Sequence, residues 1–151
     1  MDRNEVLLKE IDLIQNCIQR MDKNSFLVKG WLISLFTVII ALLPEKFDIK
    51  YLSGAGFLST LCFWYLDGFF LKMETLYRWK YEWVLKNRLI CDDYKFDLDP
   101  YNKNMWIEHT SETTKREPSI LKKMFSKINL PLYAPLLAVM LALFLNTIYC
   151  I

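Results

Sequence analysis

The stretch "YLSGAGFLSTLCFWYLDGFFL", residues 51–71, contains a single charged residue, Asp67. Apolar residues would lie all round a helix of this sequence, which is typical of a helix buried in protein or in a membrane. Crossing ~30 Å of hydrocarbon takes ~20 mostly apolar residues in a helix. The stretch therefore predicts a membrane span. An ionisable group within a span is costly and normally has a partner or a function, so Asp67 needs an explanation.

Two further apolar blocks accompany this one, "FLVKGWLISLFTVIIALL" at 26–43 and "LPLYAPLLAVMLALFLNTIYCI" at 130–151. Charged residues lie mainly between the blocks. A soluble helical bundle needs amphipathic stripes, and the blocks at 51–71 and 130–151 have none. We expect an all-α membrane protein with three transmembrane helices, the first two forming a hairpin with long cytoplasmic helical extensions.

This pattern divides the chain into four predicted segments. Residues 1–25 form a cytoplasmic amphipathic helix continuous with the first span, and 26–71 form the transmembrane hairpin. Residues 72–129 supply a cytoplasmic helix, a loop and a basic amphipathic segment, and 130–151 form the third span. Because 1–25 is charged throughout and lacks a short apolar region with a cleavage site, we expect the first span to act as an uncleaved insertion signal.

Lys and Arg are unevenly distributed along the 151 residues. Five lie up to Lys29, two lie between the first two blocks, and twelve lie between the second and third blocks. The positive-inside rule places the N-terminus and residues 72–129 in the cytoplasm and the C-terminus outside. The predicted location is the bacterial inner membrane.

The first helix is expected to begin well before its span. Apolar residues at alternating spacings of four and three form a stripe that continues into 26–43, and Pro44 would end a helix of about 39 residues. This stripe is either an intramolecular packing face or a short coiled coil. Its cytoplasmic members are Leu7, Ile11, Ile14, Ile18 and Met21, and the first four are expected at the cytoplasmic interface.

The expected partner of this stripe is a helix over 72–90, where Leu76, Trp79, Trp83 and Ile90 lie on or near one face. Acidic-first pairs four residues apart, Glu74 with Arg78 and Glu82 with Lys86, favour a helix there. Two interpretations of the two tryptophans stay open. They form an interfacial belt with helix packing, or they contact a subunit or partner, since Trp is enriched at interface hot spots.

Beyond residue 91 the periodicity decays. We expect an ordered loop or short helix near 100–110, then a flexible connection. The segment "ILKKMFSKINLP", 120–131, is expected to begin as an amphipathic basic helix whose three lysines, Lys122, Lys123 and Lys127, suit anionic headgroups.

The hairpin register suggests a partner for Asp67. Lys29 lies 15 residues before Pro44, and Asp67 lies 16 residues after Tyr51, so their depths agree within about one helical turn. We predict an intramembrane pair near the cytoplasmic edge. Two alternatives remain open for Asp67: lining a pore or subunit interface, or a snorkelling or helix-capping role at the edge.

Small and polar residues within the spans indicate helix contacts. Gly54, Gly56 and Ser59 allow another helix to approach closely, and the Asn146 amide can bond between helices where water does not compete. Three spans cannot enclose a wide aqueous path. Conduction would therefore require a homo-oligomer, with these four residues at helix contacts or lining the pore.

No enzyme motif is present, and four glycines cannot build a typical phosphate-binding loop. We expect no catalytic residue, no cofactor and no direct nucleic-acid partner. The four cysteines lack zinc-site spacing, and the aspartates at 92–99 lack an EF-hand pattern, so no metal site is predicted. The remaining catalytic alternative is a HEPN-like nuclease, since Asn104 and His109 faintly match its R-x4-H signature, although the arginine is absent.

Two motifs carry a family resemblance: N-S-F-x-x-K-G-W at 24–31 and W-x-L-D-x-x-F-L-x-x-E at 64–74, followed by "FDLDP" at 96–100. On these, the chain resembles small bacterial membrane proteins found beside antiviral systems such as retrons and CRISPR loci. The family positions here would be Lys29, Gly30, Trp31, Asp67 and Glu74, and none implies catalysis. At Gly68 and Phe69 the family has a larger or aromatic residue, so local packing is expected to differ.

The resemblance implies a membrane effector that forms pores or disturbs the inner membrane when a cytoplasmic sensor releases it. We therefore expect an oligomeric inner-membrane effector in antiviral defence, with membrane lipid, further copies of the chain and a cytoplasmic sensor or effector protein as partners. The main alternative is a non-conducting membrane anchor or regulatory subunit of a cytoplasmic enzyme. It would use residues 72–118 as its docking surface.

Overall fold

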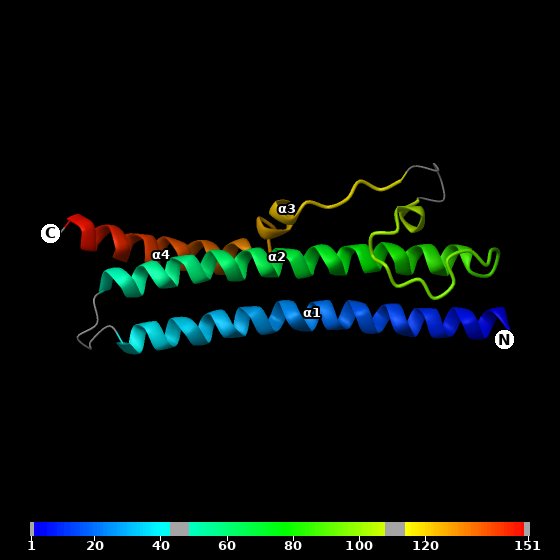
Figure 1. Cartoon of the computed structure of the whole chain (residues 1–151), viewed down its shortest axis with the longest axis horizontal. Helices are drawn as coiled ribbons and strands as arrows, with labels where there is room; N and C mark the ends of the chain where they lie inside the picture. The colour runs from blue at the N-terminus through cyan, green and yellow to red at the C-terminus, as the bar shows by residue number, and fades with distance from the viewer. Residues whose placement is uncertain (1, 43–48, 108–113, 150–151) are drawn as a thin grey trace. The chain divides into compact units, whose positions relative to one another are not determined.

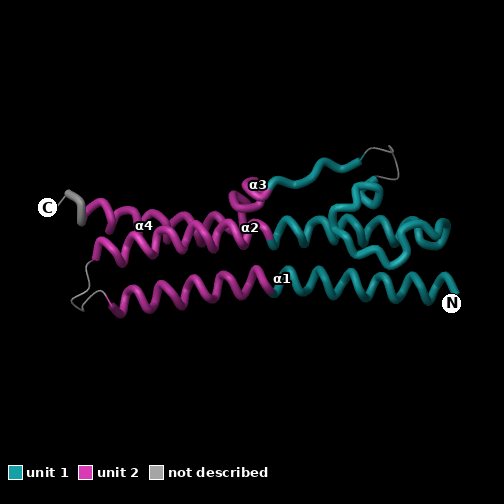
Figure 2. Tube along the Cα trace, viewed as in Figure 1, with its two compact units in different colours: residues 1–23, 70–119 teal, residues 24–69, 120–151 magenta. Residues whose placement is uncertain are grey.

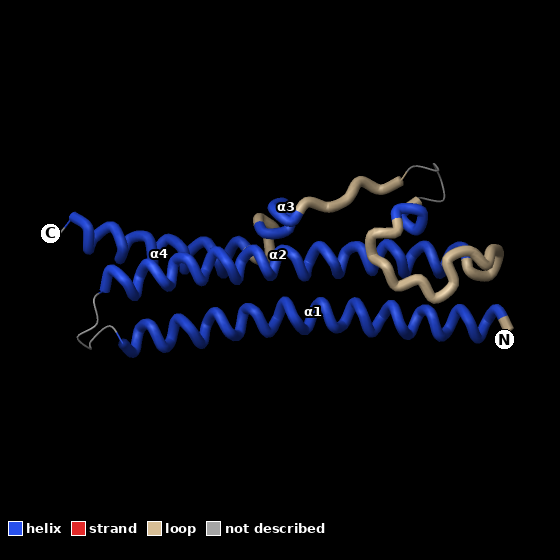
Figure 3. Tube along the Cα trace, in the orientation of Figure 1, coloured by secondary structure: helices blue, strands red, loops and turns tan. Residues whose placement is uncertain are grey.

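A computed structural model describes residues 2–42, 49–107 and 114–149. Its elements in chain order are α1 (Arg3–Leu42), α2 (Ile49–Asn87), the short 3-10 helix η1 (Lys103–Trp106), α3 (Ile120–Met124) and α4 (Leu130–Tyr149) (Figure 1). The described part contains no strand, only an isolated bridge between Ile107 and Thr114 (Figure 3). The prediction of an all-α chain is therefore confirmed for these residues.

Helix α1 is a single helix of 40 residues, close to the length that the apolar stripe predicts. Stripe residues along its whole length are buried, including Ile14, Val28, Leu32 and Ile39. Pro44, the predicted end, lies outside the described residues.

Helix α2 ends at Asn87, earlier than the predicted 90. The Asn87 side chain donates to the Trp83 carbonyl, while its own carbonyl accepts from the amides of Ile90 and Cys91 in a turn. Ile90 therefore falls beyond the helix and is 73% exposed, so its predicted place on the packing face is wrong. Glu74 does pair with Arg78.

Glu82 pairs with Lys115 at 2.7 Å instead of the expected Lys86. Lys115 lies in the extended segment that follows the Ile107–Thr114 bridge. The distant lysine thus replaces the local i,i+4 partner.

The chain divides into two compact units, and α1 and α2 contribute to both (Figure 2). Unit 1 comprises residues 1–23 and 70–119. Unit 2 comprises residues 24–69 and 120–151. Each unit is described separately below.

Unit 1 has a core between the beginning of α1 and the end of α2. Ile14 and Cys17 of α1 meet Trp83 and Val84 of α2, and Met105 of η1 completes this core. Three further stripe residues of α1, Leu7, Ile11 and Ile18, are partly buried against it.

Unit 2 packs the rest of α1 and α2 with α4. Gly54 of α2 faces Phe144 of α4, whereas Gly56 faces Met140, so α4 runs antiparallel to α2. The buried core joins all three helices and consists of Leu32, Phe36, Ile39, Trp64, Met124, Tyr133 and Met140.

The segment before α4 differs from the expected amphipathic helix. Helix α3 has only five residues, and a turn follows in which the amides of Asn129 and Leu130 both donate to the Ser126 carbonyl. This turn redirects the chain into α4, with Pro131 in its first turn, where a missing amide hydrogen costs least.

Helices α1 and α2 are long and apolar enough to cross a membrane, judged by length and composition. Helix α4 contains a third, shorter apolar stretch, Leu130–Asn146.

Candidate functional site

The predicted partners Lys29 and Asp67 lie in direct contact within unit 2. Lys29 Nζ is 2.7 Å from Asp67 Oδ2 and 2.9 Å from Oδ1. The Ser25 hydroxyl, one helical turn before Lys29, donates to Asp67 Oδ1 and accepts from Lys29 Nζ at 2.7 Å. Helix α1 thus supplies a hydroxyl and a cation to one carboxylate of α2. We call Ser25, Lys29 and Asp67 the Asp67 cluster.

Burial differs sharply within this cluster. The side chain of Asp67 is fully buried, whereas that of Lys29 is 21% exposed. A buried charge is tolerated when it is paired and hydrogen-bonded, and the cluster provides both. Tyr133 of α4 is also fully buried. The cluster itself joins α1 to α2.

Close packing surrounds the cluster on the side of α3. Trp64 lies one turn before Asp67 and donates to the Met124 carbonyl at 2.9 Å, and its ring is stacked on Tyr133. A methyl group at Gly68 would lie 2.6 Å from Met124 Cγ and 3.2 Å from the Ile120 carbonyl oxygen. Gly68 is thus the position at which α3 packs against α2.

The small residues predicted at helix contacts have different surroundings. A methyl group at Gly56 would meet Met140 Sδ at 2.9 Å and Ile39 Cδ1 at 3.0 Å, and one at Gly54 would meet Phe144 at 3.7 Å. These glycines therefore serve packing within the chain. Ser59 is half-buried, and Asn146 is at an exposed position of α4.

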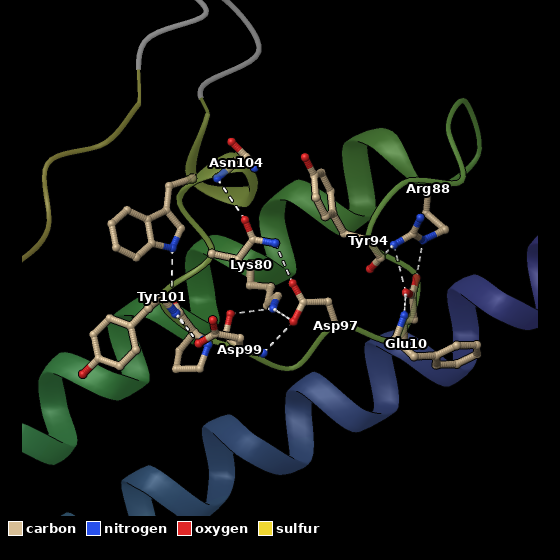
Figure 4. Close-up of polar contacts among 12 residues, drawn as sticks. Glu10, Lys80, Arg88, Tyr94, Asp97, Asp99, Tyr101 and Asn104 are labelled. Atoms are coloured by element: carbon tan, nitrogen blue, oxygen red, sulfur yellow. Dashed lines mark hydrogen bonds and ion pairs between the residues drawn. The ribbon is translucent and has the colours of Figure 1, made fainter.

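A second polar site organises the loop of unit 1 (Figure 4). Arg88 and Glu10 form a buried ion pair in which both guanidinium Nε and Nη2 donate to the carboxylate. Arg88 Nη1 also donates to the Asp93 carbonyl at 2.7 Å, and Glu10 accepts from the Phe96 amide at 2.6 Å. One charged pair thus fixes the loop after α2 onto α1.

Lys80 supplies the second anchor of this loop (Figure 4). Its side chain is 1% exposed, and its Nζ donates to the Asp99 carbonyl at 2.7 Å and lies 3.3 Å from Asp97 Oδ1. Burial lowers the pKa of Lys80, and the neighbouring Asp97 carboxylate opposes this shift. The pKa of Asp97 is lowered although burial opposes it, because Asn102, the Asp99 amide and Lys80 all donate to its carboxylate.

The two tryptophans predicted at a cytoplasmic interface lie in the packing of unit 1. Trp83 is 9% exposed in the core, and the guanidinium carbon of Arg88 lies 5.7 Å from its ring centroid. Trp79 is half-buried and meets the buried Trp106 edge-to-face, with Lys115 Nζ at 5.4 Å from its ring.

Outside these two polar sites, few residues in the part of the chain that the structure describes could bind a metal ion or take part in catalysis. Among the described residues, no three His, Cys, Asp or Glu side chains are placed to hold a metal ion. The aspartates of 92–99 act in turns and ion pairs: Asp92 with Lys95, Asp97 as above, and Asp99 accepting from the Tyr101 amide. His109, the residue of the nuclease alternative, lies outside the described residues.

Sequence reasoning missed several residues that build these two sites. Ser25 occupies a stripe position of α1 where an apolar residue is expected, and its polar side chain was the available signal. Glu10 lies beside the stripe, not on it, and carried no such signal. Arg88 and Lys80 carried no such signal either, because Arg88 pairs with Glu10, 78 residues away, and the other partners of both residues come from the irregular loop. Tyr133 lies in a uniformly apolar block and could not be distinguished from its neighbours.

Comparisons with protein-family models, characterised proteins and solved structures found no match to this chain.

Proposed function

We propose that this chain is a three-span membrane protein in which unit 2 lies in the bilayer and unit 1 in the cytoplasm. The observation that carries the proposal is the surface of unit 2. No charged residue occurs at 30–42, 51–66 or 128–149. Within these ranges large apolar side chains are exposed on all three helices, including Ile33, Leu58 and Val139. Such a surface suits lipid and would be an aggregation hazard in water.

Aromatic residues support the same placement. Trp31 and Tyr65, each two residues from the Lys29–Asp67 pair towards the apolar zone, are 61% and 53% exposed. Tyr51 is 75% exposed at the other end of that zone. Tryptophan and tyrosine favour membrane interfaces, so these positions suit the two edges of a bilayer.

We propose further that the protein acts as an oligomeric effector of the bacterial inner membrane in antiviral defence. The family resemblance of its two motifs supports this role. Gly54 and Gly56 are used within the chain, so subunit contacts must involve other positions. Helix α1 retains an exposed line of small residues at Gly30, Ser34, Thr37 and Ala41. The hydroxyls of Ser34 and Thr37 bond to carbonyls of their own helix, so this line is tolerated in lipid and at a contact.

The test of the effector role combines assembly with membrane integrity. The full chain is expressed in bacteria with a voltage-sensitive dye, and its assembly state is measured after extraction in mild detergent. We expect depolarisation together with an oligomer. Ser34→Leu with Thr37→Leu should reduce both, whereas Ile33→Leu with Val38→Leu, two exposed apolar neighbours, should change neither. A monomer in detergent with no depolarisation under any condition would overturn the effector role.

The anchor alternative has one observation in its favour. Unit 1 carries a groove of about 440 Å3 lined by Gln15, Ile18, Gln19, Arg78, Tyr81 and Glu82. A groove on the cytoplasmic unit suits docking of a cytoplasmic protein. The anchor is favoured if the protein is embedded but monomeric or dimeric, and Tyr81→Ala then abolishes recovery of a cytoplasmic partner.

A further inference from the structure

Residues 120–130 form an exposed, basic and apolar surface on unit 2. Leu121, Phe125 and Ile128 are 62%, 60% and 73% exposed. Lys122 and Lys127 are also exposed, and Lys123 is half-buried. Residues 118–151 contain no Asp or Glu, so no carboxylate side chain of this part of the chain neutralises Lys122 or Lys127. We call residues 120–130 the basic foot.

The structure holds the foot at a defined level of unit 2. Its Met124 carbonyl accepts from Trp64, its Phe125 ring lies 4.9 Å from the Trp64 ring, and Met124 and Ile120 close over Gly68. Trp64 and Gly68 flank Asp67 in sequence. The lysines of the foot therefore lie at the same level of α2 as the Lys29–Asp67 pair, where the charge-free zone ends.

This arrangement determines which ligand fits. Exposed Leu, Phe and Ile side chains beside lysines are typical of a segment in the interface of a bilayer, with apolar groups in the acyl boundary and ammonium groups among headgroups. A zwitterionic headgroup offers no net charge to three lysines, whereas an anionic phospholipid does. A soluble phosphate would satisfy the lysines but leave the apolar side chains in water.

We infer that the basic foot binds anionic phospholipid headgroups through Lys122, Lys123 and Lys127, with Leu121, Phe125 and Ile128 inserted beside them. This inference rests on the proposed membrane placement of unit 2. It adds a lipid class to that placement. Binding there would also hold α3 against Gly68 and Trp64, next to the Asp67 cluster.

The inference is tested by native mass spectrometry of the full chain released from nanodiscs containing phosphatidylcholine and phosphatidylglycerol. We expect phosphatidylglycerol to be retained in preference. Each lysine near a membrane surface is worth about fivefold in affinity at low salt, so K122Q/K123Q/K127Q should lose most of that preference. K23Q/K86Q/K103Q removes three exposed lysines of unit 1 and should leave it unchanged. Added glycerol phosphate, which lacks acyl chains, should not displace the lipid.

The outcomes separate this inference from the membrane proposal. If the protein is released from membranes by alkaline carbonate and stays soluble without detergent, the membrane proposal fails. If the protein is embedded but both triple variants retain wild-type lipid selectivity, the basic foot does not bind anionic lipid. Equal loss in both variants would mean that general positive charge acts, and would overturn the assignment to the foot.

Discussion

Lys29 Nζ lies 2.7 Å from Asp67 Oδ2, yet only the lysine is partly exposed: its side chain is 21% exposed, and that of Asp67 is 0% exposed. The two partners therefore differ in what they leave behind when one is removed. An uncompensated buried charge costs far more than a charge that can turn outward.

Lys29→Met is predicted to destabilise the protein more than Asp67→Asn. The first change strands a buried carboxylate and should cost about 3–5 kcal/mol. The second leaves an amide that still accepts from Ser25 and a lysine that can extend outward, at about 1–3 kcal/mol. Unfolding of the full chain in detergent with increasing dodecyl sulfate measures both.

The double variant K29M/D67N is the control for this pair. It should be more stable than K29M alone, because no unpaired charge remains in the core of unit 2. Equal costs of the two single changes, with additive loss in the double variant, would show that the contact does not stabilise the protein.

The three glycines of α2 should respond to alanine in a fixed order. Alanine improves helix propensity by about 0.5–1 kcal/mol, so Gly54→Ala, with Phe144 at an ordinary 3.7 Å, is expected to be neutral or stabilising. Gly56→Ala must displace the flexible ends of Met140 and Ile39 and should cost less than Gly68→Ala. Gly68→Ala meets Met124 and the Ile120 backbone and should cost about 1–3 kcal/mol.

The same unfolding assay ranks the three variants. Gly30→Ala is the matched reference, because no atom lies within 4 Å of the position of the added methyl group. A Gly68→Ala protein as stable as Gly54→Ala would mean that α3 does not sit against α2.

The helices were largely predictable from the sequence, and the loop was not. The period of the stripe in α1 and the apolar blocks depend on residues close together in the chain, so helix type, length and the Lys29–Asp67 register follow from 1.5 Å per residue. The stop of α2 at Asn87 and the shortness of α3 depend on local turns that contain no Gly or Pro to mark them in the sequence. Glu10 and Arg88, 78 residues apart, have no shared periodicity that would indicate their contact.

Arg88→Lys is predicted to loosen the loop after α2 almost as much as Arg88→Met. The guanidinium donates to Glu10 through two nitrogens and to the carbonyls of Asp93 and Tyr94, and an ammonium group cannot reproduce that geometry. Arg88→Met strands the Glu10 carboxylate, which is 3% exposed, and should cost about 3–5 kcal/mol. Hydrogen exchange of peptides covering 91–98 should accelerate in both variants.

Arg78→Lys serves as the control, because Arg78 is 61% exposed in its pair with Glu74. It should leave exchange in 91–98 unchanged. If Arg88→Lys retained wild-type protection there, the loop would be held by other contacts.

Asp97 and Lys80 are predicted to make the stability of unit 1 increase with pH in two ranges, one acid and one alkaline. The folded state lowers the pKa of Asp97 below its ordinary 3.8, so its stabilisation is present above that value and is lost as the pH falls through the lower folded value. Burial lowers the pKa of Lys80 below its ordinary 10.5. The unfolded chain therefore binds more protons between the folded value and 10.5, and stability rises with pH there.

Circular dichroism of the full chain in detergent, with thermal midpoints taken across pH, checks the rise in the acid range (the acid limb) and the rise in the alkaline range (the alkaline limb). Asp97→Asn should flatten the fall of the midpoint at acid pH, because the amide has no proton to gain. Lys80→Met should remove the rise at alkaline pH, because no ammonium remains to be neutralised. Asp22→Asn, at an exposed position of α1, should preserve both limbs. An acid limb unchanged by Asp97→Asn would assign it to other carboxylates, such as Glu117, whose pKa Lys72 lowers by donating to it.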